Sequence, residues 1–320
     1  MEPFLYTFRK LIVQTFGPRK YNKSPSPSPF LPPELERKIF EIAASAGNTT
    51  IPPLLRVAKR VKIWLEPLLY RRVLIPSRPS SGEPFLSNGD VMISITALAA
   101  AMQRLPPGFL ATHVHHLYLE VWAYRNSVYD RNRMFAALAG VTDLMLLNLR
   151  NFDGVPSLLE EISRLPLRRL HVRLAELFQS APPAIGGVVR VDFSHPLFRN
   201  ITHLSVLSEF KRDWTTGLSL VPCLTHLSFP NPAFDSDSLL VELFRACKIL
   251  RVLVVLLDPY YGDYPAEFHR MSQQEPRVVF VKARQILGWH SGICGLGGYW
   301  EQAETVIEER RLSASDNVAV

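Results

Sequence analysis

Cysteine is scarce in this chain of 320 residues, and long apolar runs do not occur. The three cysteines, Cys223, Cys247 and Cys294, are odd in number and share no CxxC spacing, so the sequence suggests neither a disulfide framework nor a zinc ribbon. The longest stretch of low polarity, residues 92–102, is far shorter than the roughly 20 residues that cross a bilayer. We therefore expect a cytoplasmic or nuclear protein that has no membrane partner.

Motifs of catalysis and of cofactor binding are also missing. The sequence contains no G-x-S-x-G, the motif that would place a serine nucleophile. Residues 292–298 are rich in glycine, but they lack Gly-Lys-Ser/Thr and the G-x-G-x-x-G order, which favours a simple turn. The one histidine cluster, His113, His115 and His116, has no acidic residue or cysteine at a ligand spacing. We expect no enzyme, no cofactor and no bound metal.

The net charge of +7 comes from the first quarter of the chain. Residues 1–78 hold 14 Lys or Arg and 5 Asp or Glu, a balance of 14 − 5 = +9. Residues 79–320 then hold 36 − 14 = 22 basic and 29 − 5 = 24 acidic residues, a balance of −2. The body of the protein lacks the basic excess that a nucleic-acid groove requires, so we expect no nucleic-acid partner.

The first 29 residues are interpreted as a disordered basic tail and a linker. Residues 24–29 are a Ser-Pro run, which neither continues a helix nor contributes to a core. After the linker, Leu35, Ile39 and Ile42 recur on one helical face. A second amphipathic stretch covers residues 54–68, with apolar residues at spacings of three and four. These two helices are expected to pack together in a helical segment at residues 30–80.

An internal repeat follows the helical segment. Seven segments fit the frame apolar-x-x-apolar-x-apolar, and their middle residues are 27, 26, 34, 23, 26 and 26 residues apart. Five of these six intervals lie in the range of about 20 to 29 residues that solenoids of alternating strand and helix use. The segments are Val114-Leu117-Leu119, Val141-Leu144-Leu146, Leu167-Leu170-Val172, Ile201-Leu204-Val206, Leu224-Leu227-Phe229, Leu250-Leu253-Val255 and Pro276-Val279-Val281.

The fold class predicted from these patterns is α/β. Helical patterns at residues 92–104, 157–165 and 238–247 alternate with the repeated strands, and the long interval is interpreted as an insertion with an extra strand near Val191. A doubly wound parallel sheet would show the same alternation, but the regular period favours an irregular solenoid over residues 81–287. Residues 288–311 are expected to form a C-terminal capping helix, and residues 312–320 a disordered tail.

The helical segment and the repeats resemble known families. Residues 30–75, with the order Leu-Pro-x-Glu-Leu-x-x-x-Ile-Phe from Leu31, resemble the F-box, in the divergent version common in large fungal families. The repeats resemble degenerate leucine-rich repeats, and the asparagine usual after each strand is replaced by Leu149, Ala175, Glu209, Pro232 and Asp258. The resemblance implies that the F-box-like segment contacts its adaptor through Leu31, Pro32, Leu35, Ile39, Phe40, Val57, Lys59 and Val61.

The resemblance implies a substrate-recognition adaptor of an SCF-type ubiquitin ligase. The F-box-like segment would dock on the ligase adaptor subunit of a cullin-based complex, and the repeats would hold a substrate protein of unknown identity. The chemistry of ubiquitin transfer would belong to other subunits. The alternative is a leucine-rich-repeat scaffold for protein interactions, unrelated to ubiquitin ligation, in which the helical pair is only a cap.

A binding surface follows from the two-residue period of the strands. The residues between the inward apolar positions should line one face of the sheet, and partner binding there should change between about pH 5.5 and 7.5, where histidine titrates. Further along, the same face becomes apolar at Val252, Val254, Leu256, Val278 and Phe280, so we expect the C-terminal element to cover it. The open part is predicted to consist of His116, Tyr118, Glu120, Asp143, Arg169, His171, Arg173, His203 and His226.

Overall fold

The computed structural model describes ten stretches of the chain, which form two compact units. Unit 1 is Met1–Leu69 and unit 2 is Tyr70–Val320. Among the described residues no helix is both long and apolar enough to span a membrane. The predicted tail and linker at residues 1–29 lie outside the described residues. The residues that the structure describes are 31–45, 50–76, 91–120, 131–147, 158–179, 189–208, 210–230, 237–257, 259 and 266–316.

Unit 1 contains the predicted helical pair. Helix α2 is Pro33–Ser45, α3 is Ile51–Leu54 and α4 is Lys59–Tyr70. Their apolar side chains share one small core. Arg60 of α4 holds the carboxylate of Glu36 of α2 in a two-pronged contact, with Nε–Oε2 at 2.9 Å and Nη2–Oε1 at 2.6 Å. The core consists of Phe40, Ala44, Ile51, Leu54, Val61 and Leu65.

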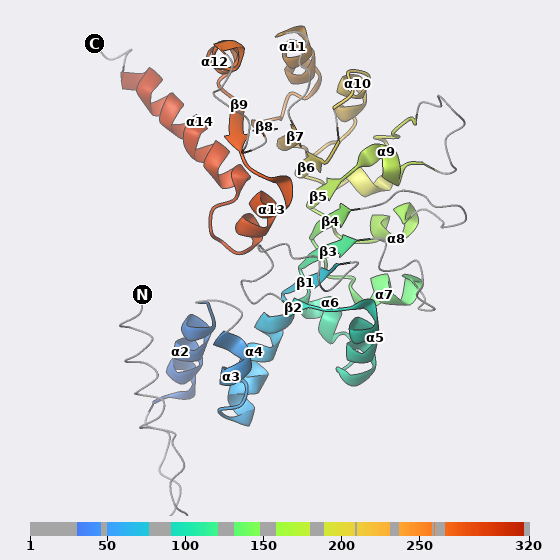
Figure 1. The fold of residues 1–320 in the computed structure, drawn as a ribbon, viewed down its shortest axis with the longest axis vertical. Coiled ribbons are helices and arrows are strands. Elements are labelled where there is room, and N and C mark those ends of the chain that lie inside the picture. The colour runs from blue at the N-terminus through green and yellow to red at the C-terminus, as the bar shows by residue number, and fades with distance from the viewer. Residues whose placement is uncertain are drawn as a thin grey trace, which may run out of the picture. The chain divides into compact units, whose positions relative to one another are not determined.

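Unit 2 is a nine-stranded sheet in which every neighbouring pair of described strands is parallel (Figure 1). Its order is β2-β1-β3-β4-β5-β6-β7-β8-β9. From β3 onward each strand pairs with the next one in the sequence, an order compatible with a solenoid. The strands are β1 Arg72–Ile75, β2 Val91–Met92, β3 His116–Glu120, β4 Asp143–Leu147, β5 Arg169–Val172, β6 His203–Val206, β7 His226–Pro230, β8 Val252–Leu257 and β9 Val278–Lys282.

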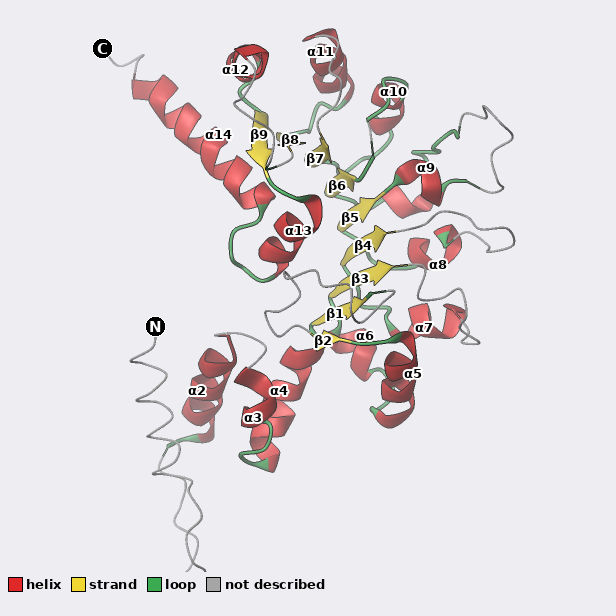
Figure 2. Ribbon diagram, viewed as in Figure 1, coloured by secondary structure: helices red, strands yellow, loops and turns green. Residues whose placement is uncertain are grey.

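Helices lie on both faces of this sheet (Figure 2). Helices α7 to α12 cover the outer face, and α13 and α14 lie against the opposite face, which we call the inner face. Helices α5, α11 and α14 confirm three predicted helices. The helices are α5 Ile95–Arg104, α6 Phe109–His113, α7 Arg131–Ala137, α8 Leu159–Ser163, α9 Leu174–Leu177, α10 Trp214–Leu218, α11 Asp237–Ala246, α12 Ala266–Gln274, α13 Gln285–Ile293 and α14 Tyr299–Asp316, with a short 3-10 helix η4 at Pro196–Phe198.

Successive turns stack through the backbone just before each strand. The carbonyl oxygen of Arg168 accepts hydrogen bonds from the amides of Thr202 (2.9 Å) and His203 (3.1 Å), and the carbonyl of Thr202 accepts from Thr225 and His226 in the same way. The Thr202 hydroxyl also donates to Arg168 O at 3.1 Å. This ladder satisfies buried amides at the start of the strands. Of the positions that lack asparagine, only Ala175 lies among the described residues, and it is in α9.

Three predicted boundaries differ from the structure. Strand β1 belongs to the sheet of unit 2, so the helical segment ends near Leu69 and not at residue 80. The C-terminal cap begins at Gln285, and α14 continues to Asp316 through part of the predicted tail. Residues 189–195 contain no strand, because Phe193 instead packs against Phe198 and Trp214 in the long interval.

The last strand is shifted by one residue from its predicted register. Val278 pairs with Leu253, so the last interval is 278 − 253 = 25 residues. Val279 and Val281 therefore face α14, whereas Phe280 stacks on Phe268 of α12. The assignment of Val278 and Phe280 to the inner face was wrong, because residues 278–281 are all apolar and show no alternation that could fix the register.

The turn between α13 and α14 is rich in glycine because the two helices approach closely. A Cβ atom on Gly298 would lie 2.8 Å from both the carbonyl oxygen of Gly288 and the Cα of Gly292. Gly298→Ala is therefore expected to push the helices apart and to lower the free energy of unfolding by about 2 kcal/mol in denaturant titrations. The control is Gly295→Asn, because Gly295 has a φ of 71° that asparagine tolerates and no atom near its Cβ position. An equal loss in both variants would contradict the close-contact explanation.

Candidate functional site

The predicted binding residues come together on the inner face. The register of the strands places the first residues of β1 and of β3 to β7 side by side in one row across the sheet. The expectation that these residues stay open is wrong for four of them, which are buried: Tyr118, Asp143, His171 and His226. Helix α13 packs Trp289 and Ile293 against the inner face of the earlier strands, and α14 covers the later ones. The row is Arg72, His116, Asp143, Arg169, His203 and His226.

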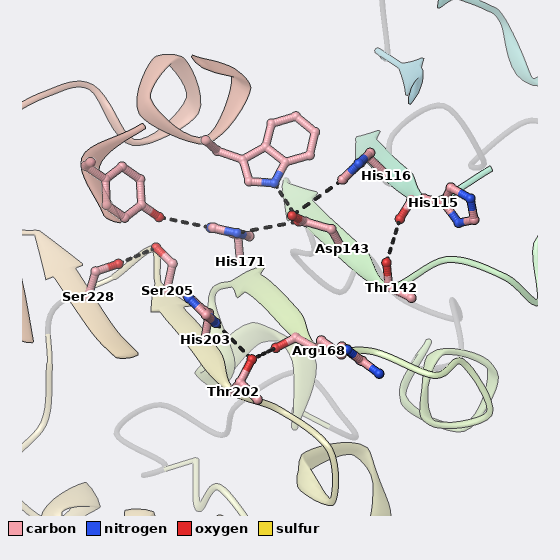
Figure 3. A network of polar contacts seen from close by, with 12 residues as sticks. His115, His116, Thr142, Asp143, Arg168, His171, Thr202, His203, Ser205 and Ser228 are labelled. Atoms are coloured by element: carbon pink, nitrogen blue, oxygen red, sulfur yellow. Dashed lines mark hydrogen bonds and ion pairs between the residues drawn. The ribbon is translucent and has the colours of Figure 1, made fainter. Parts of the chain in front are cut away.

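Asp143 of β4 is the centre of a buried polar network (Figure 3). Trp289 of α13 donates from Nε1 to Asp143 Oδ1 at 2.8 Å. His171 Nε2 lies 3.6 Å from the same oxygen, and His116 Nδ1 lies 3.6 Å from Oδ2. Burial alone would raise the pKa of this carboxyl, but the two histidines and the indole lower it below its usual value. Asp143 is therefore an ionised anchor for the C-terminal element.

His171 of β5 connects this anchor to α14. Its Nδ1 lies 3.1 Å from the Tyr299 hydroxyl. Burial lowers the pKa of His171 to about 4, with the charge of Arg169 adding to the effect and that of Asp143 opposing it. The ring is therefore neutral at pH 7. Because a carboxylate only accepts hydrogen bonds, we assign the ring proton to Nε2, which faces Asp143, and Nδ1 then accepts from Tyr299.

His203 and His226 form a second contact with α14. Their rings stack with centroids 4.0 Å apart, and both meet the edge or face of Trp300. His226 Nε2 lies 3.1 Å from Glu304 Oε1. Burial lowers the pKa of His203 to about 2 and also lowers that of His226. The prediction of histidine titration between pH 5.5 and 7.5 is thus wrong for His203 and His171.

Of the predicted surface residues not described so far, Glu120, Arg169 and Arg173 are only partly buried, whereas Tyr118 is buried. Its hydroxyl donates to Glu120 Oε1 at 2.6 Å, and its ring packs against Trp289. Arg173, just after β5, pairs with Glu176 at 3.1 Å. Sequence reasoning missed Trp289, Tyr299, Trp300 and Glu304 as members of the network, although all four lie in the C-terminal element that was expected to cover the later strands.

The predicted adaptor-binding residues divide into surface and core. Leu31, Pro32, Leu35 and Lys59 are exposed, and Ile39 and Val57 are partly buried. Phe40 and Val61 lie in the core of the helical pair, so their side chains are not available to a partner in this conformation. The sequence pattern gave Ile42 no surface role and left Ile63 out, yet both are exposed apolar side chains.

Comparisons with known proteins and a search for metal sites add no assignment. The sequence matches no family model and none of the curated proteins with which it was compared. Among the described residues no group of three or more His, Cys, Asp or Glu side chains could hold a metal ion.

Proposed function

We propose that the chain is a substrate-recognition adaptor of an SCF-type ubiquitin ligase. In this proposal the helical pair of unit 1 is an F-box-like module that docks on the ligase adaptor subunit. Unit 2 is a degenerate leucine-rich-repeat module that binds the substrate protein. The support is the resemblance of residues 30–75 to the F-box together with one structural observation on α2.

That observation is an apolar surface on the outer side of α2. The buried side of α2 consists of Glu36, Phe40 and Ala44, four residues apart. Leu35 and Ile42 lie on another side and are 54% and 53% exposed. On α4, Ile63 is 71% exposed, whereas Val61 and Leu65 are buried. A small helical pair that leaves large aliphatic side chains in water has the composition of a surface that binds a protein.

Leu35→Asp tests the docking of unit 1. Leu35 lies in the first turn of α2, where a carboxylate is favourable for the helix, so this change should remove apolar contact without unfolding the segment. We expect the purified chain to bind the ligase adaptor subunit at micromolar concentration or tighter. The variant should bind at least about tenfold more weakly, as for a residue at the centre of an interface. Fluorescence polarisation with labelled adaptor measures both.

The matched control is Leu220→Asp in unit 2. Leu220 is 58% exposed, close to the value for Leu35, and lies in the turn after α10. This control should bind the adaptor like the unchanged chain. Absence of binding by the unchanged chain at micromolar concentration would remove the ligase part of the proposal. The repeat scaffold unrelated to ubiquitin ligation would then be the better description.

A further inference from the structure

Arg169 is partly buried and has no hydrogen-bond or ion-pair partner among the described residues. It lies on the inner face in β5, between Asp143 of β4 and His203 of β6. Among the residues that the structure describes, its guanidinium makes no hydrogen bond, ion pair or ring contact. Other arginines of this unit have acidic partners, such as Arg277 with Glu275 and Arg212 with Glu242. The five N–H donors of Arg169 therefore find no acceptor in the part of the chain that the structure describes.

The two acidic groups of the inner-face contacts, Asp143 and Glu304, are already engaged. Asp143 accepts from Trp289 and faces His116 and His171. Glu304 contacts His226. The guanidinium charge nevertheless reaches the surrounding side chains, because after burial it is one of the causes that lower the pKa of His171, His203 and His226. The charge of Asp143 acts in the opposite direction on His171 and His203, and that of Glu304 acts in the opposite direction on His226.

A guanidinium that is partly removed from water and left unpaired is unfavourable for the folded chain. An anion restores the lost interactions, because the planar fork of arginine matches a carboxylate or a phosphate with two parallel hydrogen bonds. We propose that Arg169 is the centre of an anion-binding site on the inner face, which takes an acidic side chain, carboxylate or phosphate, from an acidic segment of a partner protein.

The proposal deepens the substrate-binding part of the proposed function and rests on it only for the source of the anion. It does not require that unit 1 docks on a ligase. The site lies beside the start of α14, where Tyr299 and Trp300 cover the strands, and is thus bordered by aromatic rings on one side. A bound acidic group there would lie in surroundings that strengthen its pairing with arginine.

The test compares Arg169→Met with Arg168→Met in the full chain. Arg168 is the neighbouring residue and is exposed, so it controls for the loss of one positive charge. The probes are inorganic phosphate and an octaglutamate peptide at constant ionic strength. In the unchanged chain and in Arg168→Met, phosphate at about ten times its dissociation constant should raise the unfolding temperature by about 3 °C. Arg169→Met should show no such rise, and calorimetry should give at least tenfold weaker peptide binding.

Without any anion, Arg169→Met should unfold at the same temperature as the unchanged chain or higher, because an unpaired charge is removed. A fall of more than about 3 °C would overturn the proposal, since it would show a structural partner for Arg169. Equal anion effects in all three proteins would also overturn it. Phosphate binding without peptide binding would exclude the protein as the source of the anion. Adaptor binding by Arg169→Met should be unchanged, which separates this failure from failure of the ligase proposal.

Discussion

A chain that lacks residues 285–320 is expected to lose most of its stability and to bind hydrophobic dyes. Without α13 and α14, the inner face exposes Val252, Val254, Leu256, Val279 and Val281. Burying a Val or Leu side chain contributes about 1.5 kcal/mol or more, so five of them amount to several kcal/mol. Domains are stable by only about 5–15 kcal/mol in total, and the loss is therefore decisive. Denaturant unfolding and dye fluorescence measure it.

The control for this deletion is a chain that lacks only residues 312–320. Residues 311–315 are exposed, so this shorter deletion should leave the unfolding midpoint nearly unchanged. If the longer deletion left the chain as stable and as soluble as before, the apolar strands β8 and β9 would have to be a partner groove. The proposed substrate site would then have to be moved to strands β8 and β9.

Acid is expected to destabilise unit 2 below about pH 6.5. His171 is buried as the neutral form, with a pKa lowered to about 4, whereas in the unfolded chain it titrates near 6.5. Between pH 6.5 and pH 4 the unfolded state therefore binds more protons than the folded state. Protonation of His171 in the unfolded state alone lowers the free energy of unfolding by about 3 kcal/mol at pH 4. The lowered pKa values of His203 and His226 act in the same direction. The lowered pKa of Asp143 adds a further loss below about pH 4, where the unfolded carboxyl takes up its proton.

The pH effect is measured as the slope of unfolding free energy against pH between 4 and 6.5. His171→Gln should reduce this slope by roughly one proton, whatever its effect on stability at pH 7. His269→Gln is the control, because His269 is exposed on α12 and lies outside the network. A slope that His171→Gln leaves unchanged would contradict the buried neutral state of this histidine.

The strand repeats could be predicted because their evidence is local. The sequence frame alone predicts the middle residues, and the strand register aligns five of them: Leu117, Leu144, Leu170, Leu204 and Leu227. In the frames of Leu170, Leu204 and Leu227 a polar residue separates the apolar ones, which fixes both the strand and its faces, whereas Met145 interrupts this alternation in β4. At residues 278–281 the alternation is lost, and there the predicted register failed by one residue.

The polar network could not be predicted from local patterns. Trp289 and Asp143 are 146 residues apart, and Tyr299 and His171 are 128 apart, so no periodicity connects them. The apolar residues of α13 and α14 indicated that these helices cover something. How far they reach back along the sheet depends on the turn at residues 294–298, whose geometry no sequence pattern fixed. The sequence also predicted that the apolar face of Leu35, Ile39 and Ile42 packs against the second helix, whereas Leu35 and Ile42 are exposed. An apolar stripe on a helix does not show whether it packs against its own chain or binds a partner.

The reach of the C-terminal element has a consequence for the order of folding. In a stack where each turn contacts its neighbours, the strands can form one after another as the chain is synthesised. Trp289 and Tyr299, however, are synthesised more than a hundred residues after Asp143 and His171, their partners in the polar network. Contacts of such long sequence separation form late and slowly. We therefore expect a nascent chain to pass through a state with a complete sheet and an uncovered inner face, in which aggregation or binding of a chaperone competes with closure.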